Sequence, residues 1–153
     1  MISNYGVHWQ REVIDWSRWC ELIGTGYVKR ENKYITSEAN FNEQEGLYIL
    51  HSRAGTIFSG RATRENGGLL TELRRHKRLT YTKDWSSFSW FGVLPVVDGV
   101  LVKVPGGSYI SVEGALDEFA AMLIEVCEHE RPQSRSNNER LPFKITKYNQ
   151  GID

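Results

Sequence analysis

The feature that most constrains the fold is a pair of short β-rich runs on either side of a tight turn. Residues 46–50 read GLYIL and residues 56–60 read TIFSG, with a turn-like Ser-Arg-Ala-Gly between them. Two such runs across a short glycine-containing loop predict an antiparallel hairpin. A second hairpin is predicted at Asp98-Gly99, between an aromatic and β-branched strand over 85–97 and an apolar return strand over 100–104.

Helical periodicity is expected in three segments. Residues 69–79 place leucines on one side and basic residues on the other, and residues 112–128 carry a longer apolar face after Ser111. Residues 5–23 carry aromatic side chains at steps of three and four, which predicts a helix packed on the core by its tryptophans. The residues of this stripe are Tyr5, Trp9, Val13, Trp16, Trp19 and Ile23.

The remaining segments are less patterned. Residues 27–44 are polar and read as a connector, with at best a short strand near Tyr34 and Ile35. A last short strand is expected from Phe143 to Tyr148.

Charge limits the ways in which this chain could bind nucleic acid. Lys and Arg together number 19, as do Asp and Glu, so the net charge is zero and a chain-wide basic field is excluded. Binding would need a local patch, and the run at 74–78 can be such a patch or a solvated helix end whose cations suit the helix dipole. The candidate nucleic-acid-binding residues are Arg61, Arg64, Arg74, Arg75, Lys77 and Arg78.

Two cysteines, Cys20 and Cys127, lack the spacing of a zinc site and are expected to be free thiols. The first residues lack the apolar core of a signal peptide, and no apolar run is long enough to span a membrane. A cytoplasmic protein without membrane association is therefore expected.

Several motifs stand in the order found in one nuclease family. Gly46-Leu47-Tyr48 and Phe58-Ser59-Gly60 mark the two hairpin strands, and a helix ending in His76 follows. The aromatic stretch 85–92 and the segment 121–124 come after it. Together these motifs resemble the GIY-YIG endonuclease family, in particular a bacterial or phage subgroup.

The resemblance implies an α+β fold, a GIY-YIG-like αβ sandwich in which helices flank a small antiparallel sheet. Residues 1–44 would form an aromatic-rich, helical N-terminal extension packed on the core. Residues 45–153 would form the GIY-YIG-like domain with a C-terminal tail.

The resemblance also implies phosphodiester hydrolysis with one divalent metal ion. Of the catalytic positions, Tyr48 and His76 are retained. Four other catalytic positions of the family are replaced. Phe58 stands for the second tyrosine and Glu72 for the arginine, while Ala120 stands for the metal-binding glutamate and Ser134 for the supporting asparagine.

These replacements predict a catalytically impaired protein that needs no cofactor. Glu72 reverses the charge expected beside the scissile phosphate, and two unit charges about 4 Å apart interact by several kcal/mol at an effective dielectric near 20. Ala120 offers no oxygen to a metal ion, and Phe58 carries no ionisable proton. The expected role is binding of nucleic acid, DNA rather than RNA, or of a partner protein, in a bacterial or phage defence or restriction context.

Two alternatives stay open. Glu72 could itself hold Mg²⁺, with Arg61 or Arg64 as the phosphate cation, giving an active endonuclease with a rearranged site. The chain could instead be a protein-only inhibitor or immunity-type module. The sequence does not indicate an oligomeric state.

Overall fold

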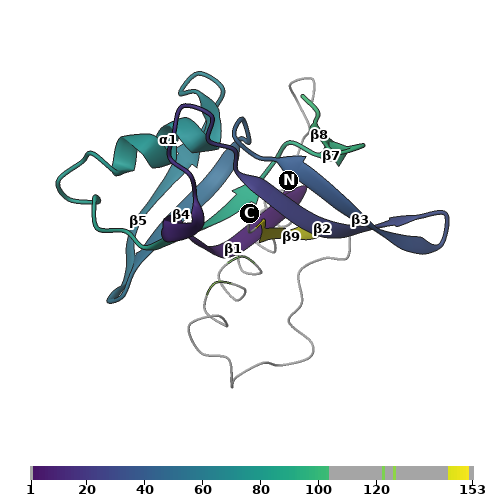
Figure 1. The fold of residues 1–153 in the computed structure, drawn as a ribbon, viewed down its shortest axis with the longest axis horizontal. Coiled ribbons are helices and arrows are strands. Elements are labelled where there is room, and N and C mark those ends of the chain that lie inside the picture. Colours follow the sequence, from purple (N-terminus) through teal and green to yellow (C-terminus); the bar gives the residue numbers. More distant parts are fainter. Residues whose placement is uncertain (1, 104–121, 123–125, 127–144, 152–153) are drawn as a thin grey trace, which may run out of the picture.

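The protein is mostly β-structure built around one large sheet (Figure 1). The computed structural model describes residues 2–103, 122, 126 and 145–151. The elements are β1 (Asn4–Gln10), the 3-10 helix η1 (Arg11–Val13), β2 (Ile23–Arg30), β3 (Lys33–Asn40), β4 (Gly46–Ser52), β5 (Gly55–Ala62), α1 (Gly68–His76), β6 (Ser87–Gly92), β7 (Val96–Val97), β8 (Val100–Leu101) and β9 (Thr146–Gln150).

Seven strands form a mixed sheet in the order β3-β2-β9-β1-β6-β4-β5. All neighbouring pairs are antiparallel except β1 and β9, which are parallel. The N-terminal strand β1 thus lies in the middle of the sheet, between β9 from the C-terminal part of the chain and β6 (Figure 1). Strands from residues 1–44 and from residues 45–153 share this single sheet.

The expected α+β sandwich of a small antiparallel sheet flanked by helices, with a helical N-terminal extension, is wrong. The sheet is large and mixed, and α1 is the only α-helix whose full extent lies in the described part of the chain. The N-terminal segment contributes three strands and only one turn of 3-10 helix.

A β-bulge lies in β1, within the segment expected to be helical. A spacing of four residues places side chains on one face of a helix and also of a regular strand, so the spacing of Tyr5 and Trp9 did not distinguish the two. Tyr5 lies opposite Phe91 and Trp9 opposite Phe88, with a register shift between Gly6 and Trp9. Within the bulge His8 has a φ of 51°. In a regular strand, residues 5 and 9 would share one face, but the bulge turns Trp9 to the opposite face of the sheet from Tyr5.

The connector expected over 27–44 is also wrong, because β2 and β3 form a long hairpin. Its turn residues Glu31 and Asn32 have φ values of 47° and 64°, as the tight turns of two-residue hairpins require. β3 is an edge strand with mostly exposed side chains, and its polar sequence therefore hides the usual apolar alternation.

Three other local predictions are confirmed, whereas the single strand expected over 85–97 is divided into β6 and β7, which belong to different sheets, and the return strand expected over 100–104 covers only Val100–Leu101 among the described residues. β4 and β5 form the expected hairpin, α1 occupies most of the helix expected over 69–79, and β7 and β8 pair across Asp98-Gly99. The C-terminal strand exists as β9, although Phe143 lies outside the described residues. The helix expected over 112–128 also lies outside them, apart from Met122 and Val126, which are helical and buried.

Apolar side chains cover both faces of the sheet. On one face, the leucines of α1 pack in one cluster with Trp9 of β1, Tyr48 and Leu50 of β4, and Phe88 and Trp90 of β6. On the other face, Tyr5, Val7 and Phe91 pack with Met122 and Val126. The first cluster is the larger, and it surrounds the polar residues described next.

Candidate functional site

A buried polar cluster lies where α1 packs on the sheet. Tyr48 is central in β4, and Glu72 and His76 are one helical turn apart, so both side chains face it. The Tyr48 hydroxyl oxygen is 2.8 Å from Glu72 Oε2 and 2.7 Å from His76 Nε2. Their exposed fractions are 1% for Tyr48, 4% for Glu72 and 0% for His76.

The start of α1 is fixed by the loop before β4. Gly67 and Gly68 have φ values of 89° and 80°, and a Cβ on Gly68 would lie 2.8 Å from the backbone of Glu43. The first helical N–H groups, of Leu69 and Leu70, donate to backbone carbonyls of that loop. These bonds satisfy N–H groups that a helix start leaves unpaired, and they orient the helix toward Tyr48.

Two further residues complete the network, which we call the Tyr48 cluster: Tyr48, Glu72, Arg75, His76 and Thr82. Arg75 Nη2 donates to Glu72 Oε2 at 2.7 Å. His76 Nδ1 and the Thr82 hydroxyl oxygen are 3.0 Å apart. The chain of contacts therefore runs from Arg75 at the surface to buried Thr82.

The number of donors and acceptors in the Tyr48 cluster indicates where its protons lie. Tyr48 has one hydroxyl proton, and an ionised Glu72 can only accept, so Tyr48 donates to Glu72. His76 must then donate from Nε2 to Tyr48. In a neutral ring its Nδ1 accepts from Thr82, whose single hydroxyl proton is also within reach of the His76 carbonyl oxygen at 3.2 Å. With a neutral histidine and an ionised glutamate, this arrangement gives a hydrogen-bond partner to Tyr48, to Glu72 and to both ring nitrogens of His76.

The pKa shifts agree with this assignment. Burial, followed by the hydrogen bond and the charge of Glu72, raises the pKa of Tyr48 above its usual value. Burial and the nearby Arg75 lower the pKa of His76, against an opposing effect of Glu72. At neutral pH the tyrosine therefore keeps its proton and is unsuited to act as a base.

Glycine and phenylalanine close the cluster on the β5 side. Gly60 lies directly opposite Tyr48 in the hairpin, and a Cβ there would be 2.7 Å from the Tyr48 hydroxyl oxygen. The Phe58 and His76 rings are 4.4 Å apart. The cluster is thus tightly enclosed, with Arg75 as its exposed end.

The cluster fits a divalent metal ion poorly. Hard cations need several oxygen ligands, and Glu72 is the single carboxylate of the cluster. Its Oε2 already accepts from Tyr48 and Arg75. Among the described residues, no group of three or more His, Cys, Asp or Glu side chains is placed to hold a metal ion.

Four of the six predicted catalytic positions meet in space: Tyr48, Phe58, Glu72 and His76. The other two, Ala120 and Ser134, lie outside the described residues. Thr82 was not predicted, because no local signal in the sequence indicates it. Arg75, predicted to contact nucleic acid, pairs with Glu72 at the i, i+3 spacing typical of an intrahelical ion pair.

The predicted nucleic-acid-binding residues fall into two places. Arg61 and Arg64 precede α1, whereas the others lie at its C-terminal end, roughly 13 Å further along a helix of this length. Two of the latter are engaged, because Arg74 donates to the Ser17 carbonyl at 2.8 Å and Arg75 to Glu72. Lys77 and Arg78 complete that group, and Arg78 is exposed.

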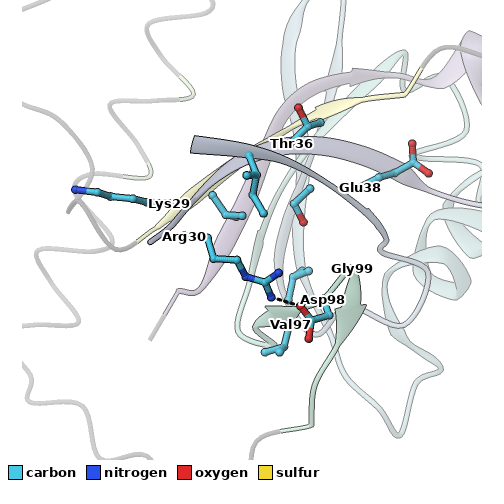
Figure 2. Close-up of a pocket in the computed structure, with 11 residues that line it drawn as sticks. Lys29, Arg30, Thr36, Glu38, Val97, Asp98 and Gly99 are labelled. Carbon is cyan, nitrogen blue, oxygen red and sulfur yellow. Dashed lines mark hydrogen bonds and ion pairs between the residues drawn. The ribbon is translucent and has the colours of Figure 1, made fainter. Parts of the chain in front are cut away.

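A separate hollow of about 430 Å³ lies between the β2–β3 and β7–β8 hairpins. Figure 2 shows Arg30 reaching across it to form an ion pair with Asp98. Both side chains are more than half exposed, so the pair contributes little stability. The lining contains no His or Cys.

Comparison with protein-family models, with curated proteins and with solved structures finds no match to this chain. Within the described residues, no helix has the length and apolar character needed to cross a membrane. Cys20 is a buried free thiol, and Cys127 lies outside the described residues.

Proposed function

We propose that this chain binds nucleic acid and does not cleave it by the mechanism of the GIY-YIG nucleases that its motifs resemble. The observation that carries the proposal is the Glu72 carboxylate, held against Tyr48 where that mechanism would use a cation. Exposed cations beside the cluster support the binding part of the proposal.

Electrostatics argue against a phosphodiester reacting at Tyr48. A carboxylate about 4 Å from a phosphate charge repels it by about 4 kcal/mol at an effective dielectric near 20, where an arginine would attract it by a similar amount. Arg75 offsets part of this repulsion, since it contacts Glu72 directly. Replacing the attraction by the repulsion changes the interaction energy by about 8 kcal/mol. If only half of this difference raised the activation free energy, the rate would fall by about three orders of magnitude.

Proton chemistry points the same way. A nuclease tyrosine must take a proton from water or position it, but the Tyr48 hydroxyl already donates to Glu72 and accepts from His76. Both bonds would have to break before substrate or water could use the hydroxyl. The cluster therefore resembles a structural network more than a reacting site.

A supercoiled-plasmid nicking assay with Mg²⁺ or Mn²⁺ tests the loss of cleavage. We expect no metal-dependent nicking by the wild-type chain, while it retains salt-sensitive binding to DNA. Nicking that disappears in Glu72→Gln would refute the proposal. It would support the alternative in which Glu72 holds the metal.

Binding measurements separate nucleic acid from a protein-only role. Affinity for DNA that falls steeply as salt rises marks contacts to phosphates. If the chain bound neither DNA nor RNA at low salt, the inhibitor or immunity-type module would become the better proposal. The defence or restriction context implied by the resemblance stays a prediction.

A further inference from the structure

A basic groove opens on the surface next to the Tyr48 cluster. Its volume is about 600 Å³, and four separate parts of the chain line it: the end of β1 with η1 and the loop that follows, the β4–β5 turn, the residue after α1 and the residue before β6. Three cations and one carboxylate line it, in a chain whose net charge is zero. The lining residues are Gln10, Arg11, Glu12, Trp16, Arg53, Lys77 and Ser86.

Arg11 is held in place before any ligand binds. Its Nη1 donates to the carbonyls of Lys83 at 2.5 Å and Trp85 at 2.9 Å, and its guanidinium lies 4.7 Å from the Trp85 ring centre. The guanidinium has five N–H donors, so donors remain for a ligand in the groove. Fixing a side chain in advance lowers the entropy lost on binding.

Lys77 is placed in a similar way. Its Nζ lies 4.3 Å from the centre of the Trp16 ring, which in turn packs edge-on against Trp85 at 5.7 Å. Burial lowers the pKa of Lys77, and the nearby Arg11, Arg74 and Arg78 lower it further. Such an effect of like charges indicates that positive charge is concentrated here.

Arg53 faces the groove from the turn of the β4–β5 hairpin and is exposed. Within the described part of the chain, none of Arg11, Arg53 and Lys77 forms a salt bridge with an acidic side chain. The three charges therefore face the groove, where Glu12 in the lining and Asp84 near Arg11 offset part of the positive charge.

We propose that this groove, through Arg11, Arg53 and Lys77, binds the phosphodiester backbone of a nucleic acid strand. The inference rests on the proposed function and gives that binding a location. It moves the binding surface away from Arg61 and Arg64 to the C-terminal end of α1. Trp16 adds an aromatic ring beside the cations, a combination typical of surfaces that track a nucleic acid strand.

Fluorescence anisotropy with a labelled oligodeoxynucleotide, single-stranded and as a duplex, tests the groove. The test variant is Arg53→Gln/Lys77→Gln, which leaves Arg11 and its structural bonds intact. The matched control is Arg61→Gln/Arg64→Gln, which removes the same charge from exposed positions before α1. Circular dichroism and thermal unfolding show that both variants keep the wild-type fold.

Each phosphate contact contributes about 0.9 to the slope of log affinity against log salt on duplex DNA. Two lost contacts lower the slope by about 1.8, so the wild type loses about 12-fold more affinity than the groove variant between 50 and 200 mM salt. We expect this change in the groove variant and not in the control. Lys77→Arg, which keeps the charge, should bind like the wild type.

The outcomes separate the two proposals. If the wild type binds and the groove variant keeps its full salt slope, the groove assignment is overturned and nucleic-acid binding stands. The same holds if the Arg61/Arg64 variant loses binding instead. If the wild type binds neither probe, the proposed function fails and the groove assignment fails with it. Binding to only one of the two probes shows whether the groove binds single-stranded or duplex DNA.

Discussion

Replacing Tyr48 by phenylalanine tests the polar cluster most directly. The change keeps the buried ring and removes only the hydroxyl that joins Glu72 to His76. Glu72 would keep Arg75 as a partner, but the Nε2 of fully buried His76 would lose its close hydrogen bond. A buried polar group without a partner costs free energy beyond the bond itself.

The expected loss of stability is about 3 kcal/mol. A hydrogen bond to a charged group contributes about 1.5–3 kcal/mol and a neutral one about 0.5–1.5 kcal/mol. For a domain of this size, a loss of 3 kcal/mol lowers Tm by about 6–12 °C. The free energy of unfolding is measured by urea denaturation, with an unchanged m value as the sign that the folded state is otherwise intact.

Tyr148→Phe is the matched control. Tyr148 is equally buried, but its hydroxyl makes only a 3.5 Å contact with Ser37. We expect a loss below about 1 kcal/mol in this variant, because a long, weak hydrogen bond contributes little. If both variants lost the same free energy, the bonds of Tyr48 to Glu72 and His76 would carry no special weight and the account of the cluster would be refuted.

Three further predictions concern burial. Burial and the adjacent His8 lower the pKa of His51 to about 4, so folding favours its neutral form. The resulting stabilisation is complete above the unfolded pKa of about 6.5 and lost as pH falls toward 4, by about 3 kcal/mol. An NMR titration of the His51 ring with a midpoint near 6.5 would contradict this. Gly60→Ala should cost about 1–3 kcal/mol in urea denaturation, because the new methyl group would overlap the Tyr48 hydroxyl; wild-type stability would show that the hairpin opens freely there. In a Cys127→Ser variant, buried Cys20, whose pKa burial raises, should react with Ellman's reagent only as the protein unfolds, and immediate labelling in native buffer would place the thiol at the surface.

Sequence reasoning succeeded where the signal is local. The β4–β5 hairpin, the α1 helix and the Asp98-Gly99 turn each depend on residues close together in the chain. The spacing of Glu72 and His76 places both on one face of the helix. The motif resemblance predicted that Tyr48 lies in the same site, and in the structure Tyr48 contacts both residues.

Sequence reasoning failed where a spacing fits two structures or where no spacing is visible. Residues four apart share one face of a helix and also of a regular strand, so Tyr5 and Trp9 did not distinguish the two, and the bulge at His8 then turns Trp9 to the other face of the sheet. The edge position of β3 exposes both of its faces to water over much of its length, so its residues show no alternation to detect. Neither effect is visible without the neighbouring strands.

By itself, the sequence determined the short-range elements and the set of side chains that could meet around Tyr48. The tertiary structure alone decided that β1 lies at the centre of a mixed sheet, that Arg75 neutralises Glu72, and that Arg11, Arg53 and Lys77 line one groove. The physical reason is range: periodicity and turn chemistry act over a few residues, whereas strand order and surface charge depend on segments far apart in the chain.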